Sequence, residues 1–181
     1  GGLVALTALQ TQAGAFPVRS AILSAPFLGV QAPVARWKRL LATLATAALP
    51  RLALPNNLDS AYLTHDAALA RAYDDDPLVS HLATAGWFQA TLRRQRLALV
   101  GAAGLRTPIH IMVAGDDRIV DNAATARFYQ RLKPEAQGRW VLFEGFYHEL
   151  LNETAYEHVH QTLLDLLDDA VLAGPDGQRP A

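Results

Sequence analysis

Ile109-His110-Ile111-Met112-Val113 is a short, mostly apolar run that leads directly into Ala114-Gly115-Asp116-Asp117-Arg118-Ile119-Val120-Asp121. An apolar run of this length is typical of a strand that is buried on both faces of a sheet. Trp140-Val141-Leu142-Phe143 repeats the arrangement, because it leads into Glu144-Gly145-Phe146-Tyr147-His148-Glu149. Both runs therefore predict strands, and the loop after each strand carries a side chain that is capable of acid–base chemistry.

Helical patterns surround these two strands. A helix rich in Ala and Leu is expected over residues 2–14, followed by a third buried strand over residues 18–24. A cap at Asp121 predicts a helix to about Leu132, and a cap at Asn152 predicts the last helix. Apolar residues repeat at helical spacing in that last helix, namely Val159, Leu163, Leu166 and Leu167. Strands that alternate with helices predict the α/β class, here with a parallel sheet of about three strands.

A long insertion separates the first predicted strand from the second. Connections between the strands of a sheet are usually much shorter than residues 27–104, and this segment has helical patterns. One apolar stripe at helical spacing consists of Trp37, Leu40, Leu41, Leu44 and Ala48. Pro50 and Pro55 are expected to end that helix. Later helices are expected after Asp59 or Ser60 and around residues 87–99, closed by Gly101 and Gly104.

The predicted organisation has four parts. Residues 1–26 and 105–172 form the core that contains the sheet. Residues 27–104 form an inserted helical cap or lid, since an insertion of this length commonly serves substrate binding. Residues 173–181 are rich in Gly and Pro and predict a disordered tail.

Acidic residues and a histidine follow consecutive strands, where the sites of parallel sheets form. His148 is suited to act as a general base at neutral pH. It would need a carboxylate to fix its tautomer and to stabilise the imidazolium. Asp117 is the best candidate, and Asp116 and Asp121 compete with it. Asp121 suits a helix cap, but spacing alone does not separate Asp116 from Asp117.

Composition excludes several classes of function. The chain has 181 residues, is 51% hydrophobic and carries a formal net charge of −1, so no strong electrostatic field points to nucleic acid. It has no cysteine, which excludes disulfides, thiolate chemistry and cysteine-based zinc sites. The helical zinc motif His-Glu-X-X-His is not met, because Asn152 stands where the second histidine would be. No cofactor and no metal are expected.

Several motifs resemble one branch of a known superfamily. The segments 115–121 and 144–150 are similar to the acid and histidine motifs of the monoacylglycerol lipase and lysophospholipase branch of the α/β-hydrolases, a serine aminopeptidase S33-like group. Leu23-Ser24-Ala25-Pro26 resembles the strand that enters the family's cap. Leu63-Thr64-His65-Asp66 and Asp76-Pro77-Leu78 resemble its cap motifs. The resemblance runs from Gly1 to about Leu167.

The resemblance implies roles for particular residues. It makes Asp117, rather than Asp116, the acid of a catalytic triad, because Asp117 precedes the Arg-Ile-Val-Asp segment. It makes His148 the base. It also implies that Phe27, Leu28 and Tyr73 lie near the path of the acyl chain and the glycerol.

The family's nucleophile turn has the pattern Gly-X-Ser-X-Gly, usually followed by another glycine. Gly1-Gly2 matches the last two positions, so the serine is expected two residues before Gly1. Ser20, Ser24, Ser60 and Ser80 do not stand in this frame. We therefore expect a C-terminal fragment that is inactive by itself. Without the strand that carries the serine, the strand at 18–24 is expected to be an exposed edge that promotes association.

The favoured interpretation is a carboxylic ester hydrolase that acts on a small-molecule lipid ester through a Ser-Asp-His triad. No nucleic-acid partner is expected, and peripheral contact with a membrane would suit such a substrate. The location is expected to be cytoplasmic or at the membrane periphery. One alternative is an epoxide hydrolase or dehalogenase, in which an aspartate replaces the serine. Another is a truncated, non-catalytic protein that binds hydrophobic ligands or partners.

Overall fold

A parallel sheet of three strands forms the centre of the described chain. The computed structural model describes residues 1–12, 17–31 and 49–172. The strands are β1 (Ala21–Ser24), β4 (Ile109–Ala114) and β5 (Gln137–Phe143), in the order β1-β4-β5. All pairs in this sheet are parallel, with Ala21 opposite Ile109 and Ile111 opposite Trp140. The α/β class and the parallel sheet predicted from the sequence are confirmed.

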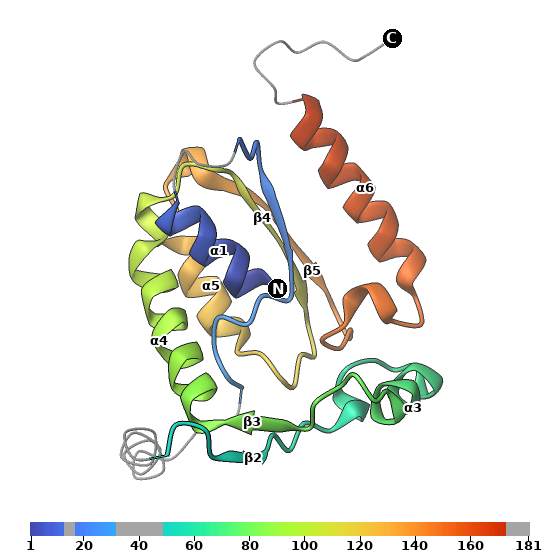
Figure 1. Cartoon of the computed structure of the whole chain (residues 1–181). Helices are drawn as coiled ribbons and strands as arrows, with labels where there is room; N and C mark the ends of the chain where they lie inside the picture. The colour runs from blue at the N-terminus through green and yellow to red at the C-terminus, as the bar shows by residue number, and fades with distance from the viewer. Residues whose placement is uncertain (13–16, 32–48, 173–181) are drawn as a thin grey trace.

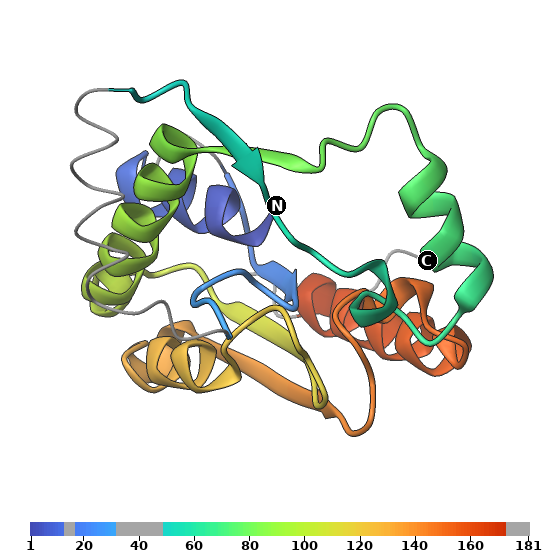
Figure 2. The same cartoon turned by 90° about the horizontal axis from the view of Figure 1, so that it is seen from below.

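Helices cover both faces of this sheet (Figures 1 and 2). On one face lie α1 (Gly2–Thr11), α4 (Ala85–Gly101) and α5 (Asn122–Gln130), and on the other lies α6 (Tyr156–Leu172). Short 3-10 helices occupy Ser60–Tyr62 (η1), Ala102–Gly104 (η2), Pro134–Ala136 (η3) and Leu150–Asn152 (η4). The described chain is therefore a three-layer arrangement of helix, sheet and helix.

The central strand β4 explains this layering, because all six of its residues are buried. Successive side chains of a strand point to opposite faces of the sheet. Ile109, Ile111 and Val113 belong to one apolar cluster, together with Leu6 of α1, Ala98 of α4 and Phe128 of α5. Met112 and Ala114 belong to a second cluster, together with Phe143, Leu150, Val159 and Leu166. A continuous apolar run is thus required, because both faces of β4 are covered.

The segment predicted to be a helical cap contains strands as well as helices. β2 (Ala53–Pro55) and β3 (Leu82–Thr84) form an antiparallel pair, and α3 (Ala67–Asp75) lies between them in the chain. Only helices were described for this segment from the sequence, and the strand pair was not predicted, because pairing between distant segments leaves little local pattern. Pro55 is tolerated because it stands in an edge strand of a two-stranded sheet, where its missing N–H is not required.

The helix expected from Asp59 or Ser60 starts as predicted, because the Asp59 side chain caps η1, but it is not continuous. It stops after Tyr62, and α3 begins at Ala67, where the Asp66 side chain accepts hydrogen bonds from the N–H groups of Ala68 and Leu69.

The predicted start of the last helix was wrong. The last helix begins at Tyr156 rather than at Asn152. The Asn152 side chain donates to Glu149 instead of capping a helix, at 2.7 Å between Nδ2 and Oε2.

Helix α4 packs against α1 rather than away from the core. The Gln10 side chain donates to the carbonyl of Ala98 at 2.9 Å, and Ala98 and Ala102 are fully buried beside Leu6. The segment 27–104 therefore returns to the core through its last helix, and the division into four parts stays a prediction. The stripe from Trp37 to Ala48 and the tail over 173–181 lie outside the described residues.

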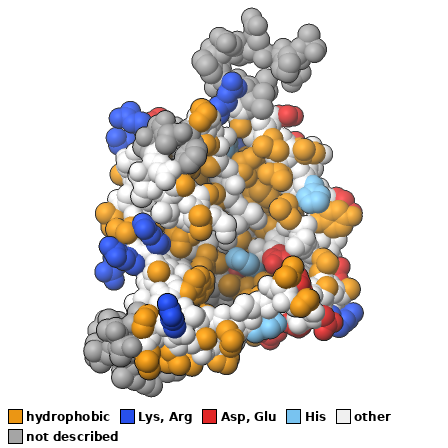
Figure 3. Space-filling model, viewed as in Figure 1, with side chains coloured by type: hydrophobic (Ala, Val, Ile, Leu, Met, Phe, Trp, Pro, Cys, Tyr) orange, Lys and Arg blue, Asp and Glu red, His pale blue; other side chains and the backbone are white. Residues whose placement is uncertain are grey.

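Strand β1 forms one edge of the described sheet, and we predict that the 181-residue chain associates through it. Hydrophobic side chains gather along this edge (Figure 3). Sedimentation velocity at micromolar concentration should detect oligomers. The N–H groups of Ala21 and Ala25 bond to the β4 side, so those of Ile22 and Ser24 point to the free edge.

A lysine at the exposed position Ser24 should place a charge on this edge and reduce the association. If the wild-type chain is a monodisperse monomer with a cooperative melt, the prediction is wrong.

Among the described residues, no helix combines the length and the apolar character that crossing a membrane requires.

Candidate active site

Two glycines bring the loops after β4 and β5 together. The Gly115 N–H donates to the carbonyl of Phe143 at 2.8 Å, and the Asp116 N–H donates to that of Phe146 at 3.0 Å. A Cβ atom at position 115 would lie 2.9 Å from both Glu144 Cα and Phe143 O, so the close approach requires glycine. Gly145 has a positive φ of 76°, which favours glycine in the turn. The loops are therefore held side by side by their backbones.

Asp117 and His148 meet across this pair of loops. The distance between His148 Nδ1 and Asp117 Oδ2 is 2.8 Å, and the Asp117 side chain is fully buried. The second oxygen of Asp117 accepts hydrogen bonds from the N–H groups of Ile119 and Val120, both at 2.8 Å. Because an ionised carboxylate can only accept, the bond assigns the proton to Nδ1 and leaves Nε2 as the basic nitrogen. The His148 side chain is 23% exposed, so its ring can be reached from solvent.

The other two acidic candidates have different surroundings. Asp116 is exposed at the turn. Asp121 is the N-cap of α5, where it accepts from the Ala123 N–H at 2.8 Å, and it also pairs with Arg127 at 3.2 Å. In the described chain, only Asp117 of these three acids contacts His148.

Phe27 and Leu28 lie on the loop after β1, which runs beside the loop that carries Asp117. The two loops are joined by an antiparallel bridge between Val30 and Val120 and by a bond from the Asp121 N–H to the carbonyl of Gly29 at 3.1 Å. Leu28 is a buried core residue at 6% exposure, and Phe27 is half-buried. Leu28 also lines a cavity of about 380 Å³ between this loop, α4 and α5. Their roles toward a substrate stay predictions.

Tyr73 is half-buried on α3 and meets the ring of His81 edge-on, with 6.1 Å between the ring centroids. Burial raises the pKa of its hydroxyl, and the carboxylates of Glu149 and Asp74 raise that pKa further. Because Glu149 is the residue after His148 and acts on Tyr73, α3 lies near the loop that carries His148. In Figure 3 the surface is hollowed between the sheet and this segment.

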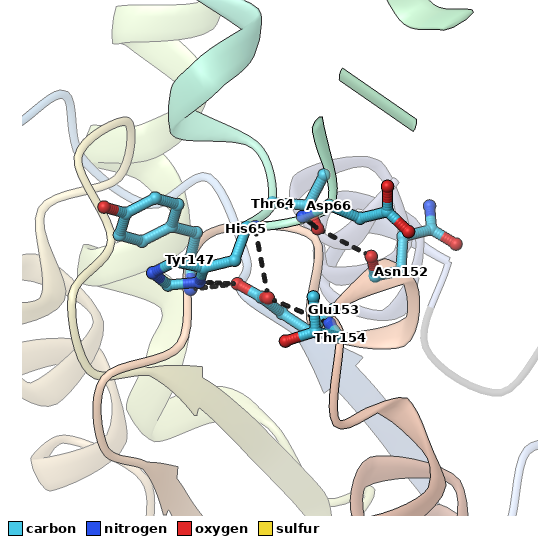
Figure 4. A network of polar contacts seen from close by, with 7 residues as sticks. All are labelled: Thr64, His65, Asp66, Tyr147, Asn152, Glu153 and Thr154. Carbon is cyan, nitrogen blue, oxygen red and sulfur yellow. Dashed lines mark hydrogen bonds and ion pairs between the residues drawn. The ribbon is translucent and has the colours of Figure 1, made fainter. Parts of the chain in front are cut away.

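Residues that the sequence analysis did not single out also surround the histidine loop. Glu153 is almost fully buried at 2% side-chain exposure and is bonded to Tyr147, His65 and Thr154 (Figure 4). The Arg118 guanidinium lies 4.9 Å from the ring centroid of Tyr147. His65 entered the sequence analysis only as part of a motif that resembles the family's cap. No local pattern marks its partner Glu153, since the two residues are 88 positions apart.

Among the described residues, no group of three or more His, Asp or Glu side chains could hold a metal ion.

His110 lies in β4, and its Nδ1 accepts a hydrogen bond from the Arg139 N–H at 3.1 Å. Burial lowers its pKa, and Arg139 adds to this effect while Asp169 opposes it. His110 is therefore a neutral, structural histidine.

Comparisons with known proteins point to one superfamily. A family described as serine aminopeptidase, S33, matches residues 1–155. Phospholipase YtpA of Bacillus subtilis (strain 168) is 28% identical over 174 residues, which are 94% of this chain and 66% of that protein. The crystal structure of Paleococcus ferrophilus monoacylglycerol lipase has a TM-score of 0.85 at 22% identity, covering 94% of this chain and 65% of that one.

A second solved structure has the same fold. It is a soluble variant of monoglyceride lipase from Saccharomyces cerevisiae in complex with a substrate analog, with a TM-score of 0.80 at 21% identity. It is covered over 59% of its length, while 94% of this chain is matched. The chain thus spans about two thirds or less of the length of these three proteins. Because the family match extends over most of the sequence, the chain belongs to the serine aminopeptidase, S33 family of the α/β-hydrolases.

Proposed function

We propose that this chain is the C-terminal part of a serine ester hydrolase of the monoacylglycerol lipase or lysophospholipase type. The observation that carries the proposal is the bond between His148 and the buried Asp117, at the ends of consecutive parallel strands. This arrangement supplies an oriented base and the carboxylate that stabilises its protonated form. The proposed nucleophile is a serine two residues before Gly1, as the resemblance of Gly1-Gly2 to the nucleophile turn suggests.

In the proposed reaction, the serine Oγ attacks the ester carbonyl while His148 Nε2 takes the hydroxyl proton. The imidazolium is stabilised by Asp117 and gives the proton to the leaving alcohol, which breaks the ester bond and forms an acyl-enzyme. In the second half of the reaction, His148 takes a proton from a water molecule that attacks the acyl carbon. It returns this proton to the serine Oγ as the acyl–enzyme bond breaks and the carboxylic acid is released. The oxyanion that forms in each step requires donors next to the nucleophile and in an earlier loop.

The proposed substrate is a small-molecule lipid ester, cleaved at or near a membrane surface. The names of the relatives support this class, since they include a monoacylglycerol lipase, a monoglyceride lipase and a phospholipase. We further propose that Phe27, Leu28 and Tyr73 contact the acyl or glycerol group. Phe27 and Leu28 lie on the loop beside that of the acid, and Tyr73 lies near Glu149, the residue after His148, which supports this proposal.

A fluorophosphonate probe tests the nucleophile directly. We expect the protein made from its complete coding sequence to be labelled on a serine two residues before Gly1, and the 181-residue chain to be unlabelled and inactive toward p-nitrophenyl esters. Peptide mapping of the labelled protein identifies the residue. An aspartate at that position would favour an epoxide hydrolase or dehalogenase, and a fragment whose own turnover disappears in H148A would prove that another nucleophile exists.

A further inference from the structure

Glu153 is a buried charge that the proposed reaction does not use. Its side chain is 2% exposed, and four groups donate to its two oxygens. The Tyr147 N–H and the His65 ring bond to Oε1 at 2.7 and 2.9 Å. The N–H groups of His65 and Thr154 bond to Oε2, both at 3.2 Å. A buried carboxylate is costly unless it is bonded in this way, so each of these bonds offsets the loss of hydration.

The charge state of Glu153 follows from these contacts. Burial pushes its pKa upward, but the hydrogen bonds from Tyr147, His65 and Thr154 outweigh burial, and the pKa lies below the ordinary value of 4.5. The side chain is therefore a carboxylate at neutral pH and can serve only as an acceptor. All four of its partners are donors that need an acceptor. Three of them are backbone N–H groups, and the fourth is the Nδ1–H of His65, in the tautomer that carries its proton on Nδ1.

The bonds of Glu153 bear directly on the backbone of the histidine loop. The Tyr147 N–H is fixed by Glu153, one residue before His148. The Glu149 N–H, one residue after His148, donates to the carbonyl of Leu63 at 2.8 Å. The position of His148 is thus bracketed by two hydrogen bonds, one to Glu153 and one to the segment that enters α3.

The same carboxylate joins this loop to residues 62–66, which we call the docking segment. Figure 4 shows His65 and Tyr147 on one side of Glu153, and Thr64 beside Asn152. The rings of His65 and Tyr147 stack with 3.7 Å between centroids and 23° between planes. The Thr64 hydroxyl donates to the carbonyl of Asn152 at 2.7 Å.

A third loop meets the docking segment through Arg118, the residue after Asp117. Its guanidinium lies 5.2 Å from the ring centroid of Tyr62 and 4.9 Å from that of Tyr147. Such distances permit cation–π attraction to both rings. The docking segment therefore contacts the loop of the acid as well as the loop of the base.

We propose that Glu153 is a positioning residue, which holds His148 in line with Asp117 and makes this alignment depend on the docking segment. The inference rests on the proposed function, because it assigns Glu153 a role toward the proposed base. The contacts of Glu153 themselves do not depend on which reaction the protein catalyses. With residues 62–66 in the observed position, Glu153 has all four partners. Displacement of this segment would remove both bonds from His65 and the bond to the Leu63 carbonyl.

The variant E153Q tests the proposal. Glutamine keeps the size of the side chain but turns one acceptor oxygen into an NH₂ group, which would face two N–H donors. In the protein made from its complete coding sequence, we expect kcat to fall about 10- to 100-fold with a smaller change in KM, as misplacement of a catalytic group does. The matched control is E157Q, which changes an exposed glutamate one turn further along the chain and should behave as wild type.

Proton NMR gives a second measurement that does not depend on turnover. The Nδ1 proton of His148 should resonate far downfield because it bonds to the Asp117 carboxylate, and in E153Q this resonance should shift or broaden. H65A should cause a smaller change in the same direction, because His65 is 44% exposed and its loss leaves the bond between Glu153 and Tyr147 in place. Thermal melting of each variant separates loss of folding from loss of alignment.

The outcomes separate this inference from the proposed function. If E153Q lowers the melting temperature but leaves the His148 resonance and kcat as in E157Q, Glu153 is merely structural and the inference is overturned. If the resonance moves in E153Q and H65A while the full-length protein hydrolyses no ester, the positioning role stands and the proposed function fails. A resonance that moves in E153Q but not in H65A overturns the dependence on the docking segment.

Discussion

Replacing His148 by alanine in the protein made from its complete coding sequence is expected to lower kcat for an ester about 10⁶-fold. The imidazole is the only base that the structure bonds to the buried Asp117 within the described chain. Without it, the serine hydroxyl keeps its proton, and the leaving alcohol has no acid to protonate it. Hydrolysis of p-nitrophenyl butyrate, followed by absorbance, measures the loss.

His160 provides the matched control for this change. It is exposed on α6 and packs near the ring of Tyr156, at 5.2 Å between centroids. H160A should therefore keep wild-type kcat and melting temperature. If H148A retains turnover within tenfold of wild type, His148 is not the base, and the proposed mechanism is wrong.

The second large effect is expected for D117N, at about 10⁴-fold in kcat. The amide oxygen of asparagine can still accept the bonds from the N–H groups of Ile119 and Val120, so the loop should keep its shape. The NH₂ group then faces His148 Nδ1, which must become an acceptor. The imidazole is forced into the other tautomer, with its proton on Nε2, and cannot take a proton from the nucleophile.

D116N is the control that separates the two neighbouring acids. Asp116 is exposed, and its backbone N–H, rather than its side chain, ties the loop to Phe146. We expect D116N to retain wild-type activity, and the downfield Nδ1 proton of His148 to persist in D116N and to disappear in D117N. An equal loss of activity in both variants would contradict the assignment of the acid to Asp117.

The local pattern was sufficient for most of the core. β4 and β5 were predicted because their apolar runs and the glycines that follow are features of the local sequence. β1 was predicted within residues 18–24 and occupies Ala21–Ser24. The stripe of the last helix was also predicted, and Val159 and Leu166 are fully buried, but Leu167 is 45% exposed. Periodicity identifies the buried face of a helix well and its margin less well, because the margin depends on what packs beside it.

The inserted segment was harder to predict. The pairing of β2 with β3 joins residues about thirty positions apart in the chain, with Leu54 opposite Ala83. Three-residue strands leave no periodic pattern, so these residues were expected only as connections between the helices of the segment. The return of α4 to the core was equally hidden, because an apolar helix face does not indicate which surface will cover it.

The sequence by itself determined the α/β class, the two loops that carry Asp117 and His148, and the resemblance that favoured Asp117 over Asp116. Only the tertiary structure decided which acid contacts the histidine, since spacing left Asp116 and Asp117 equivalent and the turn buries one while exposing the other. It alone also placed Glu153 beside His65 and Tyr147. Contacts between residues 88 positions apart arise from the packing of separate segments, and a chain pattern records only neighbours within a few turns or strands.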